Sequence, residues 1–329
     1  MYFQILIMMK FQIQKLSLPF RSLQYIVIIC LTTLLLFCLV SPIFAQTRGH
    51  AFLIASPFPD VRKINALPDL KSDLLEFADL TNQVNSDLRL MKLWLKKSGF
   101  KPDDITILNK PEQTIQAVTD SIKSHVKSLE ENALVLFYYT GHGLQILNKN
   151  QGIDKEKDSL DECLVFKEEL WVDDNINLFY TTYLSKYQNI MIMDACSMGT
   201  GYRFTNLSKR EKLIQKYTPI LGDDYENGID LTAGCAPFFV DTKHIQYNMI
   251  YIGACNDNQE SIAFLDGSWL TNRLVTISEK PQFKEGFTYR NLFCALHSFA
   301  EHDPITFSPS YIEVGDCKVL LSSVPLKIN

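Results

Sequence analysis

The sequence predicts an α/β fold in which helices cover both faces of a mainly parallel central sheet. Two observations support this prediction. From Gly49 onward, short apolar runs alternate with amphipathic stretches. The apolar runs are hydrophobic at successive positions, as expected for strands that are buried on both faces. Sheets of this kind place their functional sites at the carboxyl ends of the strands.

Five apolar runs are predicted to form strands of the sheet. Each is short, as strands usually are, and polar or helical sequence follows it. They are His50–Ala55, Asp104–Leu108, Ala133–Tyr139, Asn189–Met193 and Asn248–Ala254. Short extended pieces are expected after residue 301.

Helices are predicted between these strands. Val84, Leu88, Met91 and Leu95 recur at intervals of four, three and four, which predicts a helix over Ser86–Ser98 that Gly99 ends. Pro111 is expected to open the next helix, because proline is favourable at a first helical position. Further helices are predicted over Ile176–Lys186 and Thr288–Glu301.

Residues 1–45 are predicted to direct export, either as a cleaved signal peptide or as a membrane anchor. Tyr25–Ala45 carries no charge, and three basic residues but no acidic residue precede it. A basic flank, an apolar stretch and a small final residue are typical of a secretory signal. The stretch is also long enough to span a membrane once. We therefore expect residues 46–329 to be exported, as a periplasmic, secreted or membrane-anchored domain.

The composition of this domain excludes some classes of partner and site. Residues 1–45 hold three of the 32 basic residues and none of the 37 acidic ones, which leaves a formal net charge of −8. A nucleic-acid partner is not expected without a basic surface. The domain's cysteines are far apart and form no CxxC pair, so neither a zinc site nor a small disulfide framework is indicated, although one or two disulfides remain open. They are Cys163, Cys196, Cys235, Cys255, Cys294 and Cys317.

Two strand ends carry residues that suggest catalysis. The third strand runs into Thr140-Gly141-His142-Gly143, and the fourth runs into Asp194-Ala195-Cys196. A thiol near neutral pH needs a neighbouring base to become a strong nucleophile, and histidine is the usual base. We predict that His142 and Cys196 form a catalytic dyad. The backbone amides of Gly143 and Cys196 are candidates for an oxyanion hole.

The sequences YYTGHG and DACSMG, 54 residues apart from histidine to cysteine, resemble the motifs of caspase-like cysteine peptidases. Metacaspases and their bacterial relatives are the most similar. DECLVF and GACNDNQESIAF look like further landmarks, and the resemblance covers roughly residues 48–310. It implies a caspase-haemoglobinase-like three-layer sandwich and the hydrolysis of protein or peptide substrates. Tyr202–Tyr247 would be a long surface loop.

The resemblance to metacaspases also implies cleavage after Arg or Lys. The acids of the substrate pocket correspond to Asp87 and Asp194. A pair of carboxylates forms strong charge-assisted hydrogen bonds to a guanidinium group. Two structural roles remain open from the sequence. Asp87 would otherwise be a first-turn acid that complements the helix dipole, and Asp194 a strand-end acid bonded to backbone amides.

Calcium is the one metal ion that the resemblance suggests as a ligand. Many metacaspases bind calcium through acids near the site, and Asp161, Asp173 and Asp174 match three of those positions. The fourth acid, expected shortly after the cysteine, is missing, and Arg203 lies in that neighbourhood. No cofactor is therefore expected to be required.

The alternative to an active peptidase is a non-catalytic binding or scaffolding module, because Ser197 and Met198 differ from the residues usual in the family.

Overall fold

A mainly parallel sheet organises the computed structural model of the chain. Within the described residues the sheet has seven strands, in the order β2-β1-β3-β7-β9-β12-β8. The structure describes residues 49–66, 77–147, 160–196, 238–239, 246–256, 259, 261–264, 266–284, 286–303, 305 and 308–328. The strands are β1 (Gly49–Ser56), β2 (Ile105–Leu108), β3 (Leu134–Gly141), β7 (Gln188–Asp194), β8 (Phe238–Phe239), β9 (Asn248–Gly253) and β12 (Ser310–Val314).

All five predicted strands are confirmed, to within one or two residues at each end. The sheet is parallel except at one pair, because β12 runs antiparallel to β9. The interior strands are buried on both faces, which explains their unbroken hydrophobic sequence. Phe238–Phe239 pairs with β12 although it lies within the predicted loop 202–247; most of that loop lies outside the described residues.

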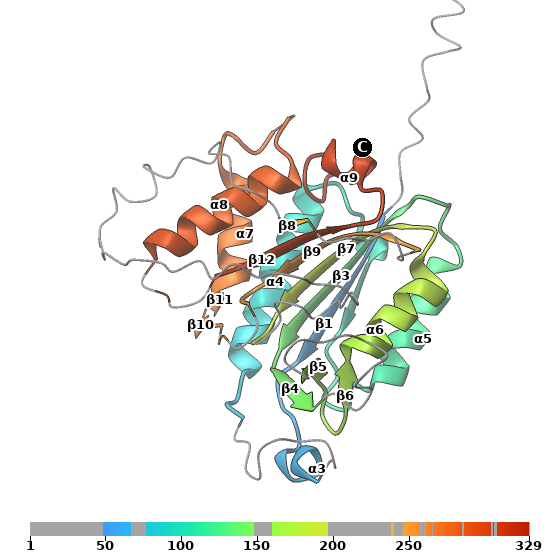
Figure 1. Cartoon of the computed structure of the whole chain (residues 1–329), viewed down its shortest axis with the longest axis vertical. Helices are drawn as coiled ribbons and strands as arrows, with labels where there is room; N and C mark the ends of the chain where they lie inside the picture. Colours follow the sequence, from blue (N-terminus) through green and yellow to red (C-terminus); the bar gives the residue numbers. More distant parts are fainter. Residues whose placement is uncertain are drawn as a thin grey trace, which may run out of the picture. The chain divides into compact units, whose positions relative to one another are not determined.

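Helices cover both faces of the sheet and make a three-layer sandwich, as predicted (Figure 1). One face packs against α4 (Thr81–Lys97), α7 (Trp269–Glu279) and α8 (Tyr289–His302). The other packs against α5 (Ile115–Val126) and α6 (Asp173–Phe179). Alternate strand residues supply the two cores. Leu136 and Tyr138 of β3, for example, face α4 and α7, whereas Phe137 and Tyr139 face α5 and α6.

Smaller elements surround this sandwich. An antiparallel sheet of β4 (Gly143–Leu147), β5 (Leu160–Val165) and β6 (Leu170–Val172) follows the end of β3. Two short strands, β10 (Ala263–Phe264) and β11 (Gly267–Ser268), form a hairpin before α7. The remaining elements are α3 (Val61–Asn65), η1 (Pro102–Asp104), η2 (Tyr180–Leu184) and α9 (Lys318–Leu321).

Three predicted helix boundaries are wrong. The helix expected at Ser86 begins at Thr81, whose amide donates to the Asp79 side chain at 2.8 Å. Pro111 does not open α5; it lies in a turn, and Thr114 caps the helix by accepting from the Ala117 amide at 3.1 Å. The helix predicted over Ile176–Lys186 begins at Asp173 and ends in the π-helical turn η2.

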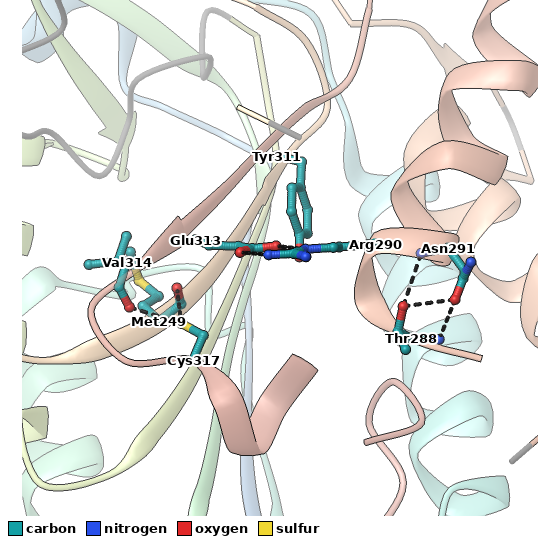
Figure 2. A network of polar contacts seen from close by, with 8 residues as sticks. All are labelled: Met249, Thr288, Arg290, Asn291, Tyr311, Glu313, Val314 and Cys317. Atoms are coloured by element: carbon teal, nitrogen blue, oxygen red, sulfur yellow. Dashed lines mark hydrogen bonds and ion pairs between the residues drawn. The ribbon is translucent and has the colours of Figure 1, made fainter. Parts of the chain in front are cut away.

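An ion pair between a half-exposed arginine and a buried glutamate joins α8 to β12 (Figure 2). The Arg290 guanidinium donates to both carboxylate oxygens of Glu313, at 2.5 and 2.6 Å, and the Tyr311 hydroxyl donates to the same carboxylate at 3.0 Å. Thr288 caps the start of α8 through a reciprocal bond with Asn291. The Glu313 side chain is 7% exposed and that of Arg290 is 43% exposed. Removal of Arg290 therefore leaves the buried Glu313 carboxylate without its counterion.

Arg290→Met is expected to lower the free energy of unfolding by about 2 kcal/mol, because the buried Glu313 carboxylate loses two charge-assisted hydrogen bonds. Urea denaturation of the purified protein measures this loss. Lys97→Met is the matched control, since its ion pair with Glu279 is exposed and should contribute less than about 0.5 kcal/mol. Equal losses in the two variants would contradict the importance given to burial.

The described residues also show the bonding state of several cysteines and bear on the predicted membrane segment. Cys163, Cys196, Cys255 and Cys317 are thiols. Cys294 forms a disulfide whose partner lies outside the described residues. No described helix is long and apolar enough to cross a membrane. Tyr25–Ala45 itself lies outside the described part of the chain, and the predicted division at residue 45 stays a prediction.

Candidate active site

His142 and Cys196 lie at the carboxyl ends of neighbouring parallel strands. Thr140 of β3 pairs with Asp194 of β7, and His142 and Cys196 each follow their paired residue by two positions. Neighbouring strands of a sheet are about 4.8 Å apart. The structure therefore brings both residues to one edge of the sheet. Cys196 is the last described residue before the gap at 197–237, and it is partly exposed.

Gly141, the last residue of β3, precedes His142 and has a backbone conformation that favours glycine. Gly141 has a φ of +155°, and a Cβ there would lie 2.7 Å from the Ser56 backbone oxygen. Any other residue would clash with β1. The Tyr139 hydroxyl donates to the His142 backbone oxygen at 3.0 Å and to the Val165 oxygen at 2.7 Å. These contacts fix the backbone that presents the imidazole.

The His142 ring is held by a backbone carbonyl group. Its Nε2–H donates to the Ala78 oxygen at 2.8 Å, and the ring packs edge-on against Phe77 with centroids 4.9 Å apart. A carbonyl oxygen only accepts, so Nε2 carries the proton and Nδ1 of the neutral ring is left to accept one. Burial lowers the pKa of His142, although the bond to Ala78 acts in the opposite direction. The ring is therefore neutral at neutral pH, as a general base must be.

Ala78 is an orienting group that the sequence prediction missed. His142 and Cys196 were expected to act as a dyad, without a third group to orient the ring. The group that holds the ring is a backbone oxygen, which leaves no side-chain signal in a sequence. Gly143 begins β4 and pairs with Leu164 of β5. Its assignment to an oxyanion hole stays a prediction.

The two predicted pocket acids, Asp87 and Asp194, lie together in the interior. Asp87 is fully buried and Asp194 is 2% exposed. The Ser268 hydroxyl contacts both, Oδ1 of Asp87 at 3.2 Å and Oδ2 of Asp194 at hydrogen-bonding distance. Asp87 also accepts from the Ser268 amide at 2.7 Å, the Thr140 hydroxyl at 2.7 Å and the Gln83 amide at 3.1 Å.

Asp194 is bonded at one oxygen only. Its Oδ2 accepts from the Thr271 hydroxyl at 2.6 Å and from the Thr271 amide at 3.1 Å. Within the described part of the chain, Oδ1 accepts no hydrogen bond. The alternative role of Asp87 as a first-turn acid is wrong, because α4 begins six residues earlier, at Thr81. The backbone-bonded role of Asp194 holds in part, through the Thr271 amide.

The charge of this acid pair is not compensated by a basic side chain. No Lys, Arg or His of the described residues contacts Asp87 or Asp194. Burial, followed by the charge of Asp87, raises the pKa of Asp194 to about 7, and burial also raises the pKa of Asp87. Two buried carboxylates without a counterion disfavour their own ionisation. A cation that entered the site would relieve this cost.

The calcium candidates lie close enough together for the charges of Asp161 and Asp174 to act on Asp173. Asp161 belongs to β5, and Asp173 and Asp174 begin α6. Burial raises the pKa of Asp173, and the charges of Glu162, Asp161 and Asp174 raise it further. No group of three or more acidic, His or Cys side chains in the described residues is arranged to hold a metal ion. The assignment of Asp161, Asp173 and Asp174 to a calcium site therefore stays a prediction.

The caspase-domain family model matches residues 76–298, which include His142, Cys196 and both pocket acids. The chain belongs to the caspase-domain family. It is therefore related to cysteine peptidases, and the predicted resemblance is confirmed at the level of the family.

Curated relatives of this caspase domain include trypanosomal metacaspases. Metacaspase-2 of Trypanosoma brucei brucei is 27% identical over 213 residues, which are 57% of this chain and 58% of that protein. Metacaspase-3 of the same organism is 26% identical over 175 residues, 46% of each chain. The chain thus matches only about half the length of these relatives.

The fold of the caspase domain is also found in a solved bacterial structure. The crystal structure of protein GSU0716 from Geobacter sulfurreducens matches with a TM-score of 0.56 and 17% sequence identity. The match covers 85% of this chain and 99% of that one. At this identity the likeness supports the predicted fold class and nothing finer.

Proposed function

We propose that this caspase domain is a cysteine endopeptidase that hydrolyses peptide bonds after Arg or Lys. The observation that carries the proposal is the buried acid pair, Asp87 and Asp194, which has no basic partner among the described residues. Asp194 precedes Cys196 by two residues. Two carboxylates suit the planar, permanently charged guanidinium group, which donates to both at once. The family supplies the reaction type, and the acid pair supplies the specificity.

In the proposed reaction, the Cys196 sulfur attacks the carbonyl carbon that follows the basic residue. Nδ1 of His142 takes the thiol proton, while the bond from Nε2–H to Ala78 keeps the ring oriented. The protonated ring then gives this proton to the nitrogen of the leaving amine as the C–N bond breaks. An acyl-thioester on Cys196 and a free amine result.

Water completes the proposed cycle. His142 takes a proton from water, whose oxygen attacks the thioester carbonyl, and the ring returns the proton to the sulfur as the C–S bond breaks. The amides of Gly143 and Cys196 are the proposed donors to the oxyanion in both steps. No step needs a metal ion, so we propose that no cofactor is required.

In the proposed pocket, the basic side chain binds the acid pair at Asp194, because Ser268 already bridges the two carboxylates. Oδ1 of Asp194 accepts no hydrogen bond from the described residues, and it is the proposed acceptor for the guanidinium group. Lysine fits as a point charge but cannot donate in the same bidentate way, so we expect Arg to be favoured over Lys. An acidic substrate residue before the scissile bond would be repelled by the two carboxylates.

A covalent label separates the peptidase from the non-catalytic module. A peptide that carries Arg followed by a terminal electrophilic group should label Cys196 within minutes. The labelling should be lost in His142→Ala. His302→Ala, at the exposed end of α8, is the matched control and should label normally. Peptide mapping by mass spectrometry identifies the labelled cysteine. Slow labelling that does not depend on His142 would favour a scaffold.

The proposed partners are exported protein or peptide substrates. Export rests on the apolar stretch Tyr25–Ala45 and its basic flank, by cleavage or by anchoring. The net charge of −8 for residues 46–329 disfavours nucleic acid. N-terminal sequencing of the protein from its native membrane and soluble fractions tests the export proposal.

A further inference from the structure

The hydrogen bonds behind the acid pair have a defined direction. The Tyr138 hydroxyl lies 2.6 Å from Oγ1 of Thr271, and Oγ1 of Thr271 lies 2.6 Å from Oδ2 of Asp194. Tyr138 and Thr271 are fully buried. These three groups come from three elements, β3, α7 and β7, and form one chain of hydrogen bonds that ends on the carboxylate.

Tyr138 determines which way the Thr271 proton points. Burial, and then the charges of Asp87 and Asp194, raise the pKa of Tyr138 well above its ordinary value, so the phenol keeps its proton at every physiological pH. A phenol proton that is donated to Thr271 occupies an acceptor site on Oγ1. The Thr271 hydroxyl then has its own proton to give, and Asp194 is its neighbour. A donor of this kind favours the ionised form of the carboxylate.

The start of α7 adds two further donors to the acid pair. The Thr271 amide donates to Asp194 at 3.1 Å, and the Ser268 amide donates to Asp87 at 2.7 Å. Gly267 permits this approach, because its φ is +130° and a Cβ there would lie 2.8 Å from Oδ1 of Asp87. The N-terminus of α7 thus stabilises the acid pair with its partial positive charge, as a basic side chain would. Unlike a basic side chain, it adds no full positive charge that would compete with the substrate cation.

We propose that Tyr138 and Thr271 are positioning residues that keep Asp194 ionised and aimed at a guanidinium group. The inference deepens the proposed specificity for Arg and Lys and rests on it. The titratable groups that the described residues place against Asp194 are Asp87 of α4 and Tyr138 of β3. The other contacts are Ser268, the residue that caps α7, and Thr271 of α7, which do not titrate in this range. Loss of the Thr271 donor should therefore leave Asp194 protonated up to a higher pH.

The test measures guanidinium binding separately from catalysis. The affinity of the full-length protein for agmatine, a guanidinium compound with an arginine-like side chain, is measured by calorimetry from pH 5.5 to 8.5. The wild type should bind more tightly as the pH rises through about 7. In Thr271→Val, which keeps the shape of the side chain, this rise should move up by about one pH unit, a tenfold weaker binding at pH 6. Thr271→Ser should restore the wild-type profile.

Tyr138→Phe provides the second variant, and it should shift the profile in the same direction. Tyr180→Phe is its matched control, because Tyr180 is equally buried but its hydroxyl makes no hydrogen bond to the described residues. An unshifted profile in both Thr271→Val and Tyr138→Phe would overturn the inference, as would a loss of binding that is equal at all pH values. If the wild type binds agmatine but cleaves no Arg peptide, the proposed function fails while this inference survives.

Discussion

Cys196→Ala is expected to lower kcat for hydrolysis of an Arg peptide by about 10⁴-fold or more, because the alanine variant has no nucleophile to form the acyl-enzyme. The Cys196 side chain is partly exposed at the end of β7, so its loss leaves no buried cavity. The variant should therefore fold and unfold as the wild type does. Steady-state turnover, with circular dichroism on the same samples, measures both properties.

Cys317→Ala is the control for this prediction. Burial raises the pKa of the Cys317 thiol to about 11, so this cysteine stays protonated and unreactive at neutral pH. The Cys317 variant should keep its turnover even if it loses stability. Activity that persisted in Cys196→Ala, or vanished only in Cys317→Ala, would mean that the nucleophile has been misassigned.

Asp194→Asn is expected to lower kcat/KM for Arg peptides by about 100-fold, which corresponds to about 3 kcal/mol for the loss of a charge-assisted bond to the guanidinium group. The asparagine oxygen can replace Oδ2 and accept from Thr271, while the new NH₂ group occupies the position of the unbonded Oδ1. The fold is thus preserved, but the NH₂ group repels the substrate cation. Cleavage rates for matched Arg peptides measure the effect.

The same substitution should change the dependence of stability on pH. The pKa of Asp194 is raised by burial, so the native state holds this proton more tightly than the unfolded chain does. Ionisation of Asp194 therefore costs stability as the pH rises from about 4 to about 7. Asp194→Asn should lack this loss and be no less stable than the wild type at pH 8. A variant that loses activity and stability together would indicate a structural role for Asp194.

Activity of the wild type should follow the acid pair at low pH. The pKa of Asp194 is about 7, whereas burial holds that of His142 below its ordinary value. The ascending limb of kcat/KM for Arg peptides should therefore reflect Asp194 more than His142. Alkylation of Cys196 by a small neutral reagent, which needs no acid pair, should lack this limb.

The sequence was sufficient to predict five of the seven described strands of the central sheet, and to predict that His142 and Cys196 follow two of them. Strands buried on both faces have unbroken apolar sequences, and β1, β3, β7 and β9 could be recognised for that reason. The motifs around His142 and Cys196 follow two of these strands directly. Their position at one edge of the sheet then followed from the rule for parallel strands.

Helix starts and the surroundings of the acids could not be predicted. The start of α4 depends on an Asp79 bond to the Thr81 amide, and α7 was not predicted because polar residues interrupt its apolar positions. Ser268 and Thr271 therefore carried no signal, although both bond to the pocket acids. They are 74 and 77 residues from Asp194 in sequence, and only the folded sheet brings them together.

The most direct test of the central claim compares cleavage of peptides that differ only in the residue before the scissile bond. Purified protein is given matched peptides with Arg, Lys, Asp or Ala at that position, with calcium and with a chelator, and kcat/KM is measured for each. We predict that Arg and Lys peptides are cleaved at least about 100-fold faster than the Asp peptide, with or without the chelator. Equal or faster cleavage of the Asp peptide would contradict the account.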